Sequence, residues 1–81
     1  MHVIVAGMAD RNTEHLISSA RAVLDELDTV GEVTLVSDHD EIAALGVHRT
    51  PGVVVDGRVV VDGRVPSEDE MRTLLAPVDG G

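Results

Sequence analysis

The chain contains no cysteine, no aromatic residue and no lysine. Without cysteine, disulfides, thiolate nucleophiles and cysteine-ligated zinc are excluded. Without aromatic rings there is no surface on which nucleic-acid bases stack, and the core must be aliphatic. No apolar run approaches the roughly 20 residues of a membrane span. We expect a cytoplasmic protein, because the first ten residues lack the basic and long apolar regions of a secretion signal.

Acidic residues dominate the charged side chains of the chain. The chain has 15 acidic side chains, six arginines and a formal net charge of −9. Such repulsion disfavours a compact state at low ionic strength, and salt near 1 M screens it by shortening the Debye length to about 3 Å. The composition is typical of a halophilic protein from a salt-rich cytoplasm, with the acidic surface of a high-GC genome as the alternative. In either case we expect no nucleic-acid or membrane partner, since both need a basic patch.

Two patterns organise the first third of the chain. The β-branched run HVIVA at residues 2–6 predicts a buried strand. Apolar residues over positions 16–27 then recur at helical spacing and predict an amphipathic helix. Asp10, Asn12 and Thr13 are each suitable as its N-cap, because their side chains accept hydrogen bonds from the first N–H groups of a helix.

The middle of the chain predicts a second strand and a short helix. Residues 32–37 (EVTLVS) favour a strand. Ser37 or Asp38 can cap a following helix that runs to Leu45, and Gly46 can end it because glycine readily adopts a positive φ.

The last third predicts a β-hairpin and a final helix. Residues 53–55 and 58–61 are Val-rich strands, and the Asp56-Gly57 pair between them favours a type I′ turn. Ser67-x-x-Glu70 is a capping box. The apolar face of the helix that follows comprises Met71, Leu74 and Leu75.

The element order β-α-β-α-β-β-α defines the expected architecture. The first two strands are joined through a helix and should be parallel, with a right-handed crossover, whereas the closing hairpin adds antiparallel strands. We expect an α/β domain at residues 1–76, with a four-stranded mixed sheet of order 2-1-3-4 and helices on both faces, and a tail at residues 77–81. A ferredoxin-like fold needs the order β-α-β-β-α-β and fits worse.

Several short motifs carry a family resemblance: Gly46-Val47, Thr50-Pro51, Asp56-Gly57 and residues 63–67 (GRVPS). With these, residues 1–76 resemble a small thioredoxin-like family of archaea and bacteria, the redox-active disulfide proteins, whose members are similar to a minimal glutaredoxin. The resemblance implies a thioredoxin-like fold and a cis peptide bond before Pro51.

The sequence departs from that family where its chemistry takes place. The family pattern Gly-x-Gly-Cys-x-x-Cys, counted from Gly7, puts Ala9 at the second glycine and Asp10 and Thr13 at the two cysteines. Thiol–disulfide exchange needs a thiolate at the helix N-terminus, and a carboxylate cannot replace it. The family's activity therefore does not carry over, and we expect a non-catalytic binding or scaffold module with no catalytic residue, cofactor or metal ion.

The family resemblance also implies a binding cleft between the loop at residues 8–13 and the loop at residues 48–51. In related folds the exposed backbone edge, here at Arg49-Thr50, pairs with an extended partner segment, so we expect a protein or peptide partner. The oligomeric state is open. The residues of this binding cleft are Met8, Asp10, Thr13, His48, Arg49, Thr50 and Pro51.

Further hypotheses remain open. Asp10 and Thr13 are most simply helix caps, and an ion pair between Asp10 and Arg49 is a hypothesis for the cleft. A non-thiol or metal site at Asp10 and His48 is another. The terminal Gly80-Gly81 is typical of carrier or modifier proteins, although the expected element order does not resemble theirs.

Overall fold

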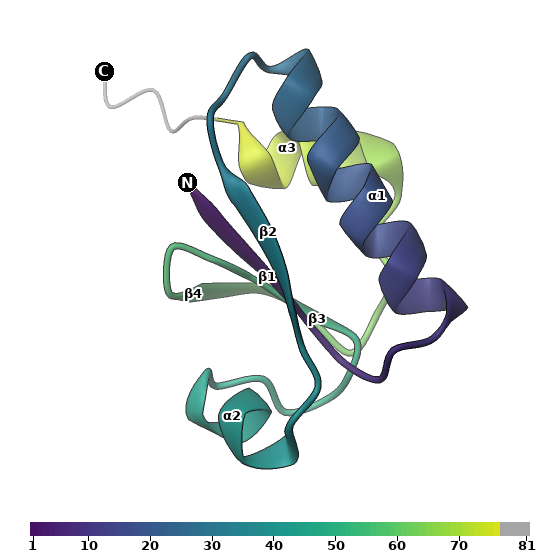
Figure 1. Ribbon diagram of the computed structural model, residues 1–81, viewed down its shortest axis with the longest axis vertical. Coiled ribbons are helices and arrows are strands. Elements are labelled where there is room, and N and C mark those ends of the chain that lie inside the picture. Colours follow the sequence, from purple (N-terminus) through teal and green to yellow (C-terminus); the bar gives the residue numbers. More distant parts are fainter. Residues whose placement is uncertain (77–81) are drawn as a thin grey trace.

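A computed structural model describes residues 1–76 of the chain, and the elements within them follow the expected order (Figure 1). The strands are β1 (His2–Ala6), β2 (Glu32–Val36), β3 (Gly52–Val55) and β4 (Arg58–Asp62). The helices are α1 (Arg11–Glu26), α2 (His39–Ala44) and α3 (Glu68–Leu75). None of these helices has the length and apolar character needed to cross a membrane.

The four strands form one mixed sheet in the order β2-β1-β3-β4. Strands β1 and β2 are parallel, whereas β1 with β3 and β3 with β4 are antiparallel. This is the predicted topology, and it places β1 at the centre of the molecule. A β-bulge between Val53 and Val54 shifts the register of the hairpin, so that Val53 pairs with Val61 while Val54 pairs with Val59.

Helices cover both faces of the sheet, as predicted. Side chains alternate along β1, because successive residues of a strand point to opposite faces. Val3 and Val5 pack with α1 and α3 in the larger cluster, while Ala6 packs with Ile42 of α2 in the smaller one. Figure 1 shows α1 and α3 together on one side and α2 apart from them. The aliphatic core therefore has two parts with the sheet between them.

The hairpin turn has the expected geometry, but the strand bounds differ slightly from the prediction. Asp56 and Gly57 have φ angles of 48° and 85°, as a type I′ turn requires. Strand β3 begins one residue earlier than expected, at Gly52, because Gly52 pairs with both Ala6 and Asp62. A Cβ at Gly52 would lie 2.6 Å from Val47 Cγ1, so close packing at this point favours glycine over a residue of high strand propensity.

The N-terminus of α3 differs from the predicted capping box. The Glu70 backbone N–H donates to Ser67 Oγ at 3.1 Å, so the first half of the box is present. The Glu70 carboxylate instead accepts two hydrogen bonds from the Arg64 guanidinium. The prediction of a complete box was wrong, because a bidentate arginine is a stronger partner for a carboxylate than a backbone N–H.

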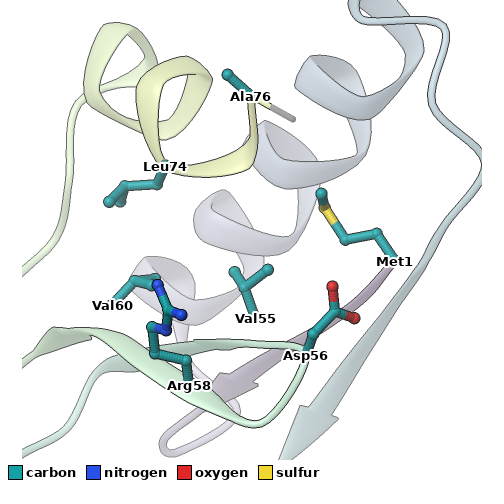
Figure 2. A pocket seen from close by; sticks show the side chains of 7 residues that line it. All are labelled: Met1, Val55, Asp56, Arg58, Val60, Leu74 and Ala76. Carbon is teal, nitrogen blue, oxygen red and sulfur yellow. The ribbon is translucent and has the colours of Figure 1, made fainter. Parts of the chain in front are cut away.

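A hollow of about 240 Å³ lies between the hairpin turn and the end of α3. Figure 2 shows the side chains around it, from Met1, Val55, Asp56, Arg58, Val60, Leu74 and Ala76. Asp56 is already engaged there, since its Oδ1 accepts from the His2 backbone N–H at 2.8 Å. The predicted tail at residues 77–81 follows Ala76 and lies outside the described residues.

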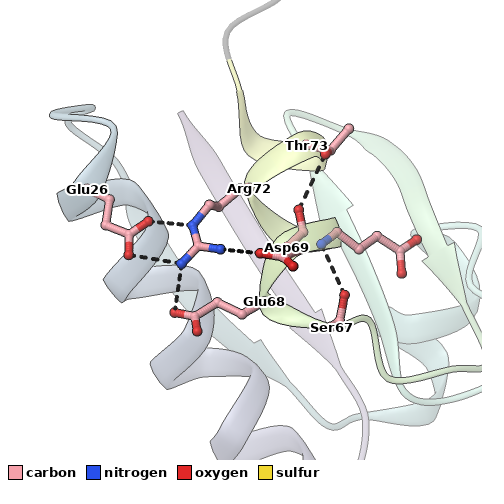
Figure 3. Close-up of polar contacts among 7 residues, drawn as sticks. Glu26, Ser67, Glu68, Asp69, Arg72 and Thr73 are labelled. Carbon is pink, nitrogen blue, oxygen red and sulfur yellow. Dashed lines mark hydrogen bonds and ion pairs between the residues drawn. The ribbon is translucent and has the colours of Figure 1, made fainter.

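Arg72 of α3 contacts three carboxylates, one of which, Glu26, is the last residue of α1 (Figure 3). Its Nε lies 2.6 Å from Glu26 Oε2, and its other nitrogens contact Glu68 and Asp69 of its own helix. The hydrogen bond from Arg72 lowers the pKa of the Glu26 carboxyl, although burial opposes it. Pairs this exposed are individually weak, but only the contact with Glu26 links two helices.

The ion pair between Arg72 and Glu26 predicts how the free energy of unfolding changes in acid. The pKa of Glu26 is lower in the folded state, so its contribution is present above the ordinary value of 4.5 and is lost as the pH falls through the folded pKa. Glu26→Gln should therefore be less stable than wild type at neutral pH, and the two should converge below pH 4.5. Urea unfolding followed by far-ultraviolet circular dichroism measures this in a chain without aromatic residues.

Glu32→Gln is the matched control for this prediction. Glu32 is an exposed carboxylate on β2, and within residues 1–76 it forms no ion pair with an arginine. A stability gap between Glu26→Gln and wild type that stays constant across the acid range would contradict the assigned role of Arg72.

Candidate functional site

Gly7 brings the start of α1 and Pro51 together at one end of the sheet. It follows β1, and a Cβ built on it would lie 2.9 Å from Thr13 Cγ2 and 3.6 Å from Pro51 Cα. The distance to Thr13 is too short for a Cβ, whereas that to Pro51 is an ordinary contact, so glycine here is what lets Thr13 lie this close. The Thr50–Pro51 peptide bond is cis. The loop that contains it therefore faces the N-terminus of α1.

Asp10 and Thr13 form a reciprocal cap at the start of α1. The Thr13 backbone N–H donates to Asp10 Oδ1 and the Asp10 backbone N–H donates to Thr13 Oγ1, each at 3.0 Å. The Thr13 hydroxyl lies 2.5 Å from the carbonyl oxygen of Met8, and Thr13 is only 2% exposed. Of the three cap candidates, the structure selects Asp10. These side chains hold the loop in place, which agrees with the simpler of their two interpretations.

Two adjoining hollows open at this end of the sheet. The proline hollow has a volume of about 190 Å³ and is lined by Gly7, Met8, Asp10, Asn12, Thr13, Thr50 and Pro51. The histidine hollow has a volume of about 280 Å³ and is lined by Met8, Ser37, His39, Ile42, Ala43, Val47, His48 and Thr50. Met8 and Thr50 line both. Every predicted cleft residue except Arg49 therefore lines one hollow or the other.

Arg49 lines neither hollow. Its side chain covers Gly63, where an added Cβ would lie 2.8 Å from Arg49 Cβ. The backbone N–H groups of Arg49 and His48 donate to Asp62 Oδ1 at 2.8 and 3.0 Å. These bonds, the one from Arg49 above all, lower the pKa of the Asp62 carboxyl. Within residues 1–76 no ion pair joins Asp10 to Arg49, so the structure does not support that hypothesis.

The hypothesis of a site at Asp10 and His48 also receives no support from the geometry. Asp10 lines the proline hollow and His48 lines the histidine hollow, and the two hollows share neither residue. Over the described part of the chain, no group of three or more histidine, aspartate or glutamate side chains lies close enough to hold a metal ion.

Sequence reasoning missed the contribution of α2 to this region. His39, the first residue of that helix, lines the histidine hollow with Ser37 and Ile42. A signal was present, because β1 and β2 are parallel. The loops after parallel strands leave the sheet at the same edge, so the loop after β2 had to approach the loop after β1.

Comparisons with known proteins agree with this architecture. The family model described as Thioredoxin domain matches residues 1–76. A protein named Thioredoxin from Methanothermobacter thermautotrophicus is 30% identical over 76 residues. The match covers 94% of this chain and 99% of that protein.

The cap geometry predicts that a thiol pair fits at the start of α1. The variant with both Asp10→Cys and Thr13→Cys should form an internal disulfide and catalyse insulin reduction, since the helix N-terminus lowers the pKa of a thiol. Loss of the Asp10 cap should cost about 0.5–2 kcal/mol in the reduced state. Mass spectrometry under oxidising conditions and an insulin precipitation assay measure the two effects.

The single variant Asp10→Cys is the control, because it keeps the exposed thiol but has no second sulfur to resolve a mixed disulfide. A double variant that stays reduced in oxidised glutathione would show that positions 10 and 13 do not have the geometry of a dithiol site.

Proposed function

Because this chain belongs to the thioredoxin domain family yet has no cysteine, we propose that it is a non-catalytic binding module that holds an extended segment of a partner protein. Its own side chains provide no thiol for disulfide exchange. Asp10 and Thr13 use their polar atoms to cap α1, so the positions that would hold the reactive sulfurs serve the shape of the cleft.

The observation that carries this proposal is the backbone of Thr50. Within residues 1–76, no hydrogen bond uses its N–H or its C=O, and the residue is exposed. Thr50 lies in the loop before β3, and the free N–H and C=O of an exposed loop residue can pair with the backbone of an extended peptide. Pro51 has no N–H, so the pairing centres on Thr50.

The two hollows beside Thr50 suit the side chains of such a segment. The histidine hollow has apolar residues in its lining, with Ile42 and Val47 buried, and takes an aliphatic side chain. The proline hollow is lined mainly by polar groups and takes a small or polar one. Thr50 lines both hollows, so successive side chains of a peptide paired with its backbone lie within reach of each.

The cleft is held in shape before any partner arrives. Asp62 fixes the backbone of His48 and Arg49, and the cap at Asp10 fixes the opposite loop. A preformed site has less conformational entropy to lose on binding, so more of the contact energy contributes to affinity. This supports a binding function over a purely structural one.

A carrier function through Gly80-Gly81 is the alternative that the sequence left open. Both glycines lie outside the described residues, and the fold of residues 1–76 gives it no support. Removal of residues 80–81 separates the two functions. It should leave binding at the cleft intact, whereas a carrier or modifier would lose its conjugation.

The binding proposal predicts site-specific crosslinking. A photoreactive amino acid at Met8, which is 62% exposed and lines both hollows, should crosslink a discrete partner in lysate from the source cells. The same group at Val30, which is 93% exposed and lies in the loop after α1, is the matched control and should give no such product. An excess of wild-type protein without the photoreactive group should suppress the crosslink, because it competes for the same partner.

Thr50→Asp tests the same contact without a photoreactive group. The charged side chain beside the backbone of residue 50 should disturb pairing with the partner. The variant should therefore compete at least about tenfold less well than wild type against the crosslink at position 8, which corresponds to about 1.4 kcal/mol. Thr73→Asp on α3 is the control, since Thr73 is also exposed and lies outside both hollows. Equal crosslinking from positions 8 and 30, or equal competition by the two aspartate variants, would remove the cleft as the binding site.

We also propose that the protein works in a concentrated-salt cytoplasm. Its net charge is −9, and the ion pairs of Arg64 and Arg72 engage only a minority of its 15 carboxylates. Salt weakens those few pairs, but it also screens the repulsion among all the remaining acidic groups. The second effect involves more charges, so salt should stabilise the fold overall.

The thermal midpoint should therefore rise between low and molar potassium chloride. Each gain of about 1 kcal/mol raises the midpoint of a domain of this size by about 4–8 °C. Sucrose at matched osmolality is the control, because it stabilises proteins without screening charge. A flat response to salt, or a rise no larger than that in sucrose, would contradict adaptation to high salt.

A further inference from the structure

The lining of the histidine hollow includes two imidazoles and a thioether, supplied by three different segments. Met8 comes from the loop after β1, His39 is the first residue of α2, and His48 comes from the loop between α2 and β3. All three are exposed, and the 62% exposure of Met8 contrasts with the fully buried Met71. The three donors therefore border one space of about 280 Å³ rather than the core.

The two imidazoles are available as ligands. No hydrogen bond within residues 1–76 uses a ring nitrogen of His39 or His48, whereas His2 Nε2 lies 3.1 Å from Thr34 Oγ1. Their backbones are nevertheless held in place. Asp38 caps α2 directly before His39, and Asp62 accepts the His48 backbone N–H. Fixed backbones with unengaged rings allow the side chains to turn toward a common ligand.

The lining of the histidine hollow favours a metal cation, but not a hard one such as magnesium or calcium. The lining contains no arginine, because the Arg49 side chain lies over Gly63, and the whole chain carries a net charge of −9. The lining also contains no carboxylate, although oxygen ligands are what magnesium and calcium require. A zinc site needs three or four converging nitrogen, sulfur or oxygen donors of its usual kinds, and residues 1–76 contain no such group.

Imidazole nitrogen with thioether sulfur is the donor set of a softer ion. Thioether sulfur selects cuprous copper over the hard divalent cations, and imidazole binds copper as well. We propose that Met8, His39 and His48 form a binding site for a soft monovalent metal ion, cuprous copper in its native setting. The step is ligand binding alone, with no electron transferred. It does not depend on the partner-binding function proposed above.

Silver(I) is the first probe, because it is soft, monovalent and stable in air. The full-length protein is titrated in sodium nitrate, since chloride would precipitate the metal. The methyl resonance of Met8 and the ring resonances of His39 and His48 should move together, with one shared isotherm and a stoichiometry of one ion per chain. The ring resonances of His15, an exposed residue of α1, should stay in place.

Substitution of each donor tests whether the three act as one site. Met8→Leu, His39→Asn and His48→Asn should each weaken silver binding at least about tenfold, since even outer-shell changes at metal sites cost about 10–100-fold. His15→Asn is the matched control and should bind as wild type does. All four positions are exposed, so amide spectra should show an unchanged fold in every variant.

Cuprous copper is then tested directly, without oxygen, by competition with a chromogenic cuprous chelator. Wild type should withdraw the ion from the chelator, and the three donor variants should not. Separate silver isotherms for the sulfur and the rings, binding that the variants retain, or failure to compete for cuprous copper would overturn the proposal. The crosslinking experiments at Met8 are run with a metal chelator present. Their outcome then tests partner binding alone and does not depend on whether the metal site exists.

Discussion

The close approach of Thr13 and Pro51 across Gly7 is the constraint on which the arrangement of this protein depends. The missing side chain at Gly7 lets the end of β1, the start of α1 and the loop before β3 meet at one point. A Cβ there would lie 2.9 Å from Thr13 and would force these segments apart. The proline hollow lies at that contact, because Gly7, Thr13 and Pro51 all line it.

Next to this contact, Asp10 and Thr13 form a polar pair at the start of α1. The N-terminus of α1 presents unsatisfied N–H groups and a partial positive charge, which can either activate a thiol or accept a cap. Asp10 and Thr13 accept hydrogen bonds from these groups and thereby remove the reactive option. Beside this cap lies Thr50, whose backbone N–H and C=O form no hydrogen bond within residues 1–76. The proposed binding function uses this backbone and the shape of the cleft, and it needs no thiol.

Local signals were enough to predict two of the three strand pairings, since Asp56-Gly57 defined the hairpin and the helix between the first strands made them parallel. Two of the misses share one physical cause, which is a side-chain partner that local rules ignore. Arg64 engages Glu70 and leaves the capping box half formed. Asp62 anchors the backbone at Arg49, whose side chain lies over Gly63 rather than toward Asp10.

The bulge between Val53 and Val54 has an influence that reaches beyond the hairpin. It sets which residue of β4 lies opposite Gly52, and that residue is Asp62. A register slip by one position would turn this carboxylate to the other face of the sheet and release the loop that it anchors. An inserted or deleted residue in β3 or β4 would therefore displace the carboxylate that anchors His48 and Arg49, and would change the shape of the cleft from a position outside it.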